Sequence, residues 1–543
     1  MSASDRAVRA TFIIVGAGSA GCVLANRLSE DPAASVLLLE AGGTDTRPVL
    51  QMPLTWLTAA TARRFGWGYL SEPEACAEGR ILPIPRGKVL GGCSSINGMI
   101  YARGHSRDYD DWAAMGLAGW SYAHVLPYFR RSESNWRGRS DYHGDQGPLA
   151  TRRIHDPREP IREVLFAAAR ELGYPCIEDG HSATEEGFLV PDFTIQNGRR
   201  ASASTQYLAP VRGRSNLRIL TGALATRVVL EGTTVRGVEF EHRGNRMSAQ
   251  AESEVILCGG AFNSPKLLLL SGIGPAGEIR SAGITPAHDL PGVGRNLQEH
   301  PTIFGLHQAR TRETFEPQLR MDRLAFSIGR WFLFGNGPAS GMPFGIAGFC
   351  RSHPECDRPD IQLMATPTAM HARPWFPMLR PGVGHFISTG GLALHPRSRG
   401  SVRLRSADPH APPRIHFSLL EDPADRLALR QCVQTLRSWM GTSAAARLVG
   451  AEVMPGPLVQ TDAQIDAYVR ANAGISHHPV GTCAMGTSEA AVVDGQLRVR
   501  GIDRLRVVDA SIMPNIVGGN TNAPTMMIAE VAADLIRGRP PAT

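Results

Sequence analysis

One glycine-rich turn near the start of the chain constrains the fold more than any other segment. An apolar run at residues 11–15 leads into Gly16, Gly18 and Gly21, which have the spacing G-x-G-x-x-G, and a helix-forming run follows. In a dinucleotide-binding βαβ unit the first glycine forms a tight turn, the second lets a pyrophosphate approach the backbone, and the third lets the helix pack against the strand. The pattern therefore predicts a strand, a phosphate-binding turn and a helix, in this order.

A second apolar run, SVLLLE at residues 35–40, supports this interpretation. It ends in Glu40, 19 residues after Gly21, where a carboxylate can accept hydrogen bonds from a ribose. A nucleophile elbow, G-x-S-x-G, fits the same turn less well, because Ala17 occupies its first glycine position and Glu40 would have no role. The turn alone does not distinguish NAD from FAD.

Composition argues against several classes of protein. The 543 residues are enough for two or three domains, and the net charge of +7 is scattered instead of forming the basic stripe of a nucleic-acid-binding protein. The nine cysteines show neither a C-x-x-C pair nor zinc-ligand spacing, so we expect reduced thiols and no metal site. No apolar run reaches the roughly 18 residues of a transmembrane helix, and glycines interrupt the N-terminal run, which disfavours a signal peptide. We expect a cytoplasmic protein, with peripheral contact to a membrane left open.

Five separated segments carry a resemblance to a known enzyme family. They are RGKVLGGCSSINGMIYARG (86–104), GAFNSPKLLLLSGIGP (260–275), LPGVGRNLQEHP (290–301), GISHHPVGTCAMG (474–486) and RLRVVDASIMPNIVGGNTNAPTMMIAEVAADLI (504–536). In order and spacing they are similar to the motifs of the glucose–methanol–choline (GMC) oxidoreductases, over nearly the whole chain. The residues are most similar to the choline-dehydrogenase-like branch. The resemblance implies an FAD enzyme that oxidises alcohols.

The fold that the resemblance implies is α/β, an α+β mosaic of two domains. A Rossmann-like FAD-binding domain would comprise residues 1–159, 201–305 and 461–543, and an inserted substrate-binding domain, built on an antiparallel sheet, would comprise 160–200 and 306–460. The sequence fits this division. Residues 217–242 alternate like strands in hairpins, and residues 401–420 have the pattern of strands in the second sheet. Residues 422–440 have the pattern of an amphipathic helix that would cover this sheet.

The resemblance also implies which residues contact FAD. They are Gly16, Gly18, Ser19, Ala20, Gly21, Glu40, Ala41, Gly87, Gly91, Gly92, Ser95, Asn97, Gly98, Met99, Ile100, Val228, Ala261, Asp509, Ala510, Asn522 and Thr525. Some relatives bind FAD covalently through a histidine at the position of Ile96, whose side chain has no nucleophilic atom, so non-covalent FAD is expected. Some of the contacts have a structural alternative: the segment GGCSSING could be a surface turn, Val228 is typical of a buried strand, and Asp509 could cap a helix.

His478 and Asn522 match the family's catalytic base and its partner. Oxidation of a primary alcohol to an aldehyde removes a hydroxyl proton and a hydride, and the resemblance implies hydride transfer to flavin N5. A neutral imidazole suits the proton, and an amide N–H suits the alkoxide oxygen. His477 would be a neighbour of the base. A helix expected after Pro524 would point its N-terminus at the flavin. Without the other motifs, the two adjacent histidines would be interpreted as residues of a turn.

The substrate is expected to be a neutral primary alcohol instead of choline. A buried quaternary ammonium needs an aromatic cage, a carboxylate or both, and Gly345 stands where we align the carboxylate of choline-oxidising relatives. An apolar pocket is expected from Trp331, Phe332, Phe334, Met342, Phe344, Met364, Trp375 and Phe376.

Several alternatives stay open at this level. They are a lyase or photodecarboxylase of the same fold, a flavin-binding structural protein, and a choline dehydrogenase proper. The electron acceptor is expected to be O2 or a quinone or dye. The oligomeric state is left open.

Overall fold

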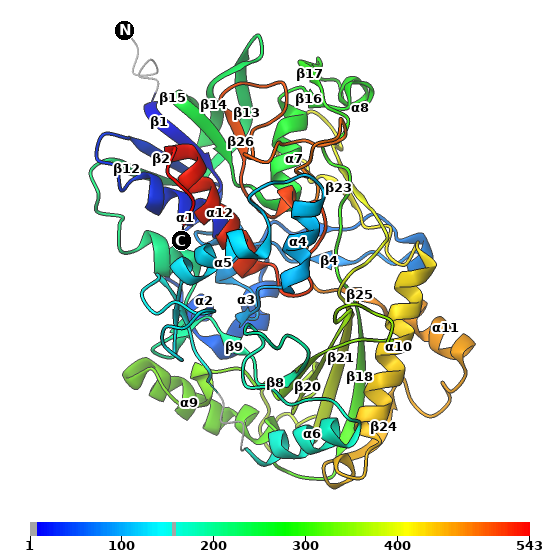
Figure 1. Cartoon of the computed structure of the whole chain (residues 1–543). Helices are drawn as coiled ribbons and strands as arrows, with labels where there is room; N and C mark the ends of the chain where they lie inside the picture. The colour runs from blue at the N-terminus through cyan, green and yellow to red at the C-terminus, as the bar shows by residue number, and fades with distance from the viewer. Residues whose placement is uncertain (1–7, 155–158, 543) are drawn as a thin grey trace.

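A computed structural model describes residues 8–154 and 159–542 and shows a mixed α/β molecule organised around two seven-stranded sheets (Figure 1). The predicted fold class, a dinucleotide-binding sheet joined to an antiparallel one, is confirmed. Each sheet gathers strands from distant parts of the chain, so the two halves are interleaved in sequence.

The first sheet has the strand order β12-β2-β1-β15-β14-β13, with β26 beside β15. Its parallel strands are β1 (Val8–Val15), β2 (Val36–Glu40), β12 (Leu217–Thr221), β15 (Asn245–Leu257) and β26 (Leu505–Val507). The antiparallel strands β13 (Ala223–Glu231) and β14 (Thr234–His242) extend the β15 edge, as the hairpin pattern predicts. Every residue of β2 is buried, and Val36–Leu39 accordingly form a continuous apolar run instead of an alternating one.

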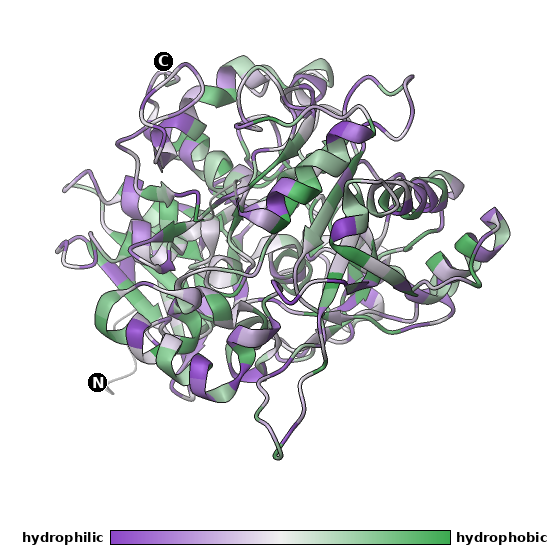
Figure 2. Cartoon of the chain, turned by 90° about the horizontal axis from the view of Figure 1, so that it is seen from below, coloured by the Kyte–Doolittle hydropathy of each residue, from purple (hydrophilic) through white to green (hydrophobic). Residues whose placement is uncertain are grey.

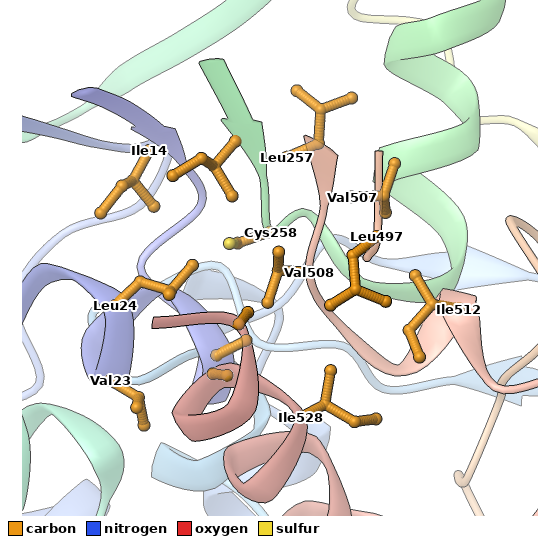
Figure 3. Close-up of a cluster of buried hydrophobic side chains, with 14 of the residues drawn as sticks. Ile14, Val23, Leu24, Leu257, Cys258, Leu497, Val507, Val508, Ile512 and Ile528 are labelled. Atoms are coloured by element: carbon orange, nitrogen blue, oxygen red, sulfur yellow. The ribbon is translucent and has the colours of Figure 1, made fainter. Parts of the chain in front are cut away.

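Two helices from opposite ends of the chain pack over the parallel strands. They are α1 (Ser19–Leu28) and α12 (Asn522–Arg537). In Figure 3, Leu24 of α1 and Ile528 of α12 lie in one cluster with Ile14, Leu257 and Val508. A Cβ atom at Gly21 would collide with the carbonyl oxygen of Gly16, so only glycine lets α1 approach the strand this closely.

The second sheet is antiparallel and has the order β24-β18-β21-β20-β19-β8, with β25 beside β18. The strands are β8 (Gly187–Leu189), β18 (Pro301–Ala309), β19 (Ile346–Cys350), β20 (Ile361–Thr366), β21 (Phe386–Ala393), β24 (Val449–Met454) and β25 (Gly474–Ile475). Helix α10 (Pro423–Met440) packs on this sheet through Leu429, Val433 and Leu436, as predicted. Strand β18 crosses the predicted domain limit at residue 305. Strand β25 belongs to the second sheet although it follows the predicted limit at residue 461. The domain limits themselves stay a prediction.

One sequence expectation about the second sheet is wrong. Residues 401–420 form β22 (Ser401–Arg403) and β23 (Arg414–His416), which pair only with each other. The backbone at β22 binds the segment before β18 instead: the N–H of Gly400 donates to Leu297 O, and that of Val402 donates to Gly294 O. This hairpin therefore binds residues 290–300, the connector that leads from the first sheet to β18 of the second.

The other helices lie around the two sheets. They are α2 (Pro48–Gln51), α3 (Trp56–Thr61), α4 (Ser106–Ala114), α5 (Tyr122–Ser132), α6 (Pro160–Glu171), α7 (Gly260–Leu270), α8 (Ala276–Ser281), α9 (Met321–Phe334) and α11 (Asp462–Asn472). Figure 2 shows hydrophilic and hydrophobic residues alternating along outer helices, as expected where one face meets solvent. In the described parts of the chain, no helix is long and apolar enough to cross a membrane.

Candidate active site

A cavity of about 1050 Å³ is lined by residues from both sheets. The glycine-rich turn between β1 and α1 forms one part of its wall, and His478 with its loop forms another. Strands β18, β20 and β21 supply Thr302, Gln362 and Leu392 from the second sheet. The cavity is therefore shaped both for a dinucleotide at the glycine-rich turn and for a smaller molecule beside the antiparallel sheet.

The glycine-rich turn fits a dinucleotide. A Cβ atom at Gly16, which has φ +103°, would stand 2.5 Å from Cys258 O, and one at Gly92 would stand 2.7 Å from Gly18 Cα. A Cβ atom at Gly18, in contrast, would meet nothing closer than Cys258 O at 4.0 Å, although Gly18 lines the cavity. Backbone atoms therefore pack closely against Gly16 and Gly92, whereas no neighbouring atom covers Gly18, which borders the cavity. A pyrophosphate needs such an open position to approach the backbone.

Glu40 lies at the end of β2, in the cavity wall. Its Oε2 accepts from the N–H of Ala17 at 3.0 Å and its Oε1 from that of Gly42 at 2.8 Å. A carboxylate has about four acceptor sites, so both oxygens can still accept ribose hydroxyls. Burial raises the pKa of Glu40 to about 7, and ribose donors would favour the charged form.

Asn522 is joined to the glycine-rich turn and not to His478. Its Oδ1 accepts from Ser19 Oγ at 2.7 Å, which ties the first residue of α12 to the first residue of α1. The helix begins at Asn522, three residues earlier than predicted, because a proline is tolerated in the first turn of a helix. This geometry suits Asn522 as a cofactor contact, and among the described residues no hydrogen bond joins its amide to His478.

His478 lies in a loop that is held by its backbone. His477 has φ +64°, and its carbonyl oxygen accepts from Arg86 Nη2 at 2.5 Å. The N–H of His478 donates to Glu299 Oε1 at 2.7 Å. Burial, with the nearby His300, His477 and Arg86, holds the pKa of His478 well below its ordinary value. The imidazole is therefore neutral at physiological pH, as a general base must be.

A chain of hydrogen bonds determines which nitrogen of His478 carries the proton. His300 Nε2 lies 3.0 Å from Leu394 O, and a carbonyl oxygen can only accept, so this nitrogen of His300 is protonated. Burial lowers the pKa of His300 to about 3, so the ring is neutral and its Nδ1 is an acceptor. That Nδ1 lies 3.0 Å from His478 Nδ1, which must donate. The lone pair of His478 is therefore on Nε2.

Asn520 faces this lone pair. Its Nδ2 lies 3.0 Å from His478 Nε2, and its Oδ1 is buried without a partner among the described residues. Both side chains line the cavity. An acceptor and an amide donor thus stand together, which is the pair that an alcohol hydroxyl group needs when it loses its proton.

Three consecutive residues of the connector hold this arrangement, and the sequence analysis assigned them no role. Gln298 binds the loop before Asn520: its Nε2 donates to Pro514 O at 2.9 Å and its Oε1 accepts from the N–H of Ile516 at 3.1 Å. Glu299 binds the backbone of His478, and His300 binds its imidazole. The segment LQEHP was visible in the sequence as a family motif, but only the fold shows what each side chain contacts.

Most predicted cofactor contacts line the cavity. They are Gly16, Gly18, Ser19, Ala20, Glu40, Ala41, Gly87, Gly92, Asn97, Gly98, Met99, Ile100, Ala261, Asp509, Ala510, Asn522 and Thr525. Ile96 lines it as well. Asp509 also caps a short helix: it accepts from Ser511 N–H at 2.8 Å and from Gly260 N–H at 2.8 Å. The helix-cap interpretation of Asp509 is therefore confirmed, and its contact with the cofactor stays a prediction that its place in the cavity wall allows.

Four predicted contacts do not border the cavity. Gly21 packs against Gly16, and Ser95 turns away to donate to Leu90 O at 2.8 Å. A Cβ atom at Gly91 would collide with the hydroxyl of Ser95. The N–H of Val228 donates to Ser271 Oγ at 2.8 Å. Strand β13 borders the cavity only at Ala223–Ala225, because it leaves the cavity before it reaches Val228.

The substrate side differs from the sequence expectation. Gly345 is not part of the cavity wall, and a Cβ atom there would point at Ala365 O, so it is not the place for a substrate carboxylate. Of the expected apolar residues, Met342, Phe344 and Met364 line the cavity. The others lie outside it: Trp331 is buried beside Met52, Trp375 donates to Glu316 O, and Phe332, Phe334 and Phe376 are exposed.

The described residues contain no cluster of three or more histidine, cysteine or acidic side chains that could hold a metal ion. The wall of the cavity is instead built from a dinucleotide-type turn and a neutral imidazole beside an amide. These features define an oxidoreductase that binds a dinucleotide cofactor.

Comparison with known proteins agrees with this class. Models of the GMC oxidoreductase family match residues 10–302 and 396–529. An oxygen-dependent choline dehydrogenase of Sinorhizobium fredii is 40% identical over 545 residues, covering 98% of this chain and 96% of the relative. The structure of pyridoxine 4-oxidase from Mesorbium loti matches with a TM-score of 0.88 and 32% identity, covering 98% of this chain and 100% of the other. A formate oxidase of Aspergillus oryzae studied for FAD modification matches with a TM-score of 0.90 and 27% identity, covering 98% of each chain.

The chain therefore belongs to the GMC oxidoreductase family. Members of this family are FAD-dependent enzymes that act on CH–OH donors, and the glycine-rich turn with Glu40 fits FAD. The resemblance seen in the sequence is confirmed.

Proposed function

We propose that this enzyme oxidises a neutral primary alcohol to an aldehyde, with His478 as base and Asn520 as its partner. The observation that carries the proposal is the 3.0 Å contact between Asn520 Nδ2 and His478 Nε2 at the cavity wall. It moves the partner role from Asn522 to Asn520, two residues earlier in GNTNAPT. O2 or a quinone-type acceptor would complete the cycle.

The chain's own residues handle the proton and the charge. The alcohol hydroxyl would lie beside Nε2 of His478, which takes its proton, and the amide of Asn520 would donate to the oxygen as negative charge develops there. Bound FAD would supply the acceptor for the hydride that leaves the alcohol carbon. The chain Leu394–His300–His478 keeps the base in the correct tautomer without any charge.

We expect FAD to be held without a covalent bond. Ile96, which lines the cavity, offers no nucleophilic atom. Acid or heat precipitation of the purified yellow protein should therefore release about one FAD per chain into the supernatant. A yellow pellet under a colourless supernatant would contradict this expectation.

Choline should be a poorer substrate than neutral alcohols. The only acidic residues in the described cavity wall are Glu40, which binds Ala17 of the glycine-rich turn, and Asp509, which binds Gly260 and Ser511, so neither is bonded to the loops of His478 and Asn520. The wall is otherwise cationic or neutral: Arg86 approaches His477, and Thr302, Gln362 and Thr366 are polar without charge. A quaternary ammonium buried here would lack a counter-charge.

The test compares kcat/KM for choline with kcat/KM for benzyl alcohol, a furanyl alcohol and hexanol, using an artificial acceptor and oxygen in turn. We expect at least one neutral alcohol to exceed choline by about tenfold or more. A clear preference for choline over all three would instead make the chain a choline dehydrogenase, as the name of its 40% identical relative suggests.

His300 should act as a positioning residue. In His300→Ala, Nδ1 of His478 loses its acceptor and the tautomer is no longer fixed, so we expect kcat to fall about 10- to 100-fold with little change in KM. His300→Gln places an amide oxygen near His478 Nδ1 and should recover most of the loss. Equal kcat in His300→Ala and wild type, measured at steady state with an artificial acceptor, would contradict the role.

A further inference from the structure

Exposed apolar side chains are concentrated around one part of the cavity. We define the apolar rim as residues 54–70, 319–336 and 368–382. It contains about a tenth of the chain, yet it carries eleven of the eighteen exposed large hydrophobic residues in the described structure. They are Leu57, Leu70, Met321, Phe326, Phe332, Leu333, Phe334, Met370, Phe376, Met378 and Leu379.

The three segments of the rim form one surface. The N–H of Met321, at the start of α9, donates to Trp375 O at 2.8 Å, which joins the second and third segments. Leu54 and Ile328 pack in one cluster around Trp331, which joins the first and second. Figure 1 shows α9 at the outer edge of the molecule, on the same side as α2 and α3. The exposed residues therefore belong to one continuous surface that faces solvent.

The apolar character of α9 is on its outer face. Trp331 and Ser327 point inward and are buried, whereas Phe326 and Leu333 are 71% and 75% exposed. In the third segment Met378 is fully exposed. Soluble proteins rarely leave a patch of this kind uncovered unless it meets a partner or a membrane.

The charge of the rim favours a membrane surface over a protein partner. It contains seven arginines and one acidic residue, Asp322, whose carboxylate is held by Arg320. Exposed arginines flank the apolar residues in each segment, with Arg63 in the first, Arg323 in the second and Arg380 in the third. Apolar side chains that alternate with arginine are complementary to an anionic lipid surface, where the apolar groups enter the interface and the guanidinium groups meet the headgroups.

We propose that the apolar rim docks the enzyme onto an anionic membrane surface without spanning it. The same segments border the cavity, since Leu324, Ile328 and Met370 are part of both. Docking would turn this part of the cavity wall toward the lipid, so that apolar molecules dissolved in the bilayer could enter without crossing water. The proposal concerns the surface and does not depend on the alcohol chemistry.

The test measures binding of the FAD-loaded enzyme to large unilamellar vesicles by flotation. Vesicles of phosphatidylcholine alone are compared with vesicles that also contain phosphatidylglycerol. We expect binding to the anionic vesicles, weakened by roughly 100-fold when Leu333, Phe334, Met378 and Leu379 are all changed to serine. Arg373→Gln with Arg380→Gln should weaken binding to the anionic vesicles by about fivefold per arginine.

The matched control is the pair Leu427→Ser and Leu458→Ser, which removes exposed leucines outside the rim and should leave binding unchanged. The flavin absorbance spectrum reports whether each variant is folded. The proposal is overturned if the wild-type enzyme does not float with anionic vesicles or if the control pair weakens binding as much as the rim variant. It is also overturned if sedimentation velocity shows a dimer that the rim variant converts to a monomer, because a second copy would then cover the rim.

Discussion

His478→Ala should retain FAD and lose between about 10² and 10⁴ in the rate of flavin reduction by alcohol, which is the usual effect of removing a general base. The substitution removes the Nε2 lone pair and leaves the loop in place, because the loop is held by backbone bonds to Glu299 and Arg86. Anaerobic stopped-flow reduction measures the effect directly, and the visible flavin spectrum is the control for folding.

The wild-type enzyme should also show a pH signature. Because the pKa of His478 is held well below its ordinary value, the base stays unprotonated as the pH falls through about 6.5. The acid limb of kcat/KM should therefore lie below that pH. A wild-type rate in His478→Ala would transfer the role of base to His477.

Asn520→Ala and Asn522→Ala should have different effects although the two residues are almost adjacent. Asn520→Ala removes the amide donor beside His478 Nε2 and should slow flavin reduction about 10²-fold with FAD retained. Asn522→Ala breaks the bond to Ser19 Oγ, which joins two helix N-termini at the cofactor end of the cavity. It should weaken FAD binding and change the rate of the FAD-loaded enzyme little.

The pair is its own matched control, because each variant removes one asparagine from the same short segment. Equilibrium dialysis of FAD and stopped-flow reduction separate the two effects. If Asn522→Ala slowed the FAD-loaded enzyme about 10²-fold while Asn520→Ala did not, the partner role would return to Asn522.

The sequence predicted the parts of the site that depend on local pattern. The turn at Gly16, the strand ending in Glu40 and the candidate base His478 could be identified because glycine spacing, apolar runs and family motifs occupy short continuous stretches. The helix α10 was predictable for the same reason, since its period of apolar residues is sustained over its whole length.

The remainder of the site depends on contacts between distant segments. The sequence analysis assigned the partner role to Asn522, and only the start of α12, the position of Ser19 and the contact of Asn520 with His478 distinguish the two asparagines. The strand pattern of residues 401–420 does not indicate which sheet these residues join. Their place depends on backbone hydrogen bonds to Gly294 and Leu297, which are distant in the sequence. Aromatic residues such as Phe332 and Trp375 fit a pocket by composition, but helix phase and backbone contacts place them elsewhere.

The connector at residues 298–300 also limits how the two halves can move. Enzymes with a cofactor domain and a substrate domain often open and close about the segment that links them. Here that segment carries Gln298, Glu299 and His300, each of which holds one of the two reacting loops, and β18 begins at the next residue. A hinge at this place would separate His300 from His478 at every opening. We therefore expect the two sheets to keep their relative position during catalysis, with substrate entering past peripheral segments that border the cavity, such as α9.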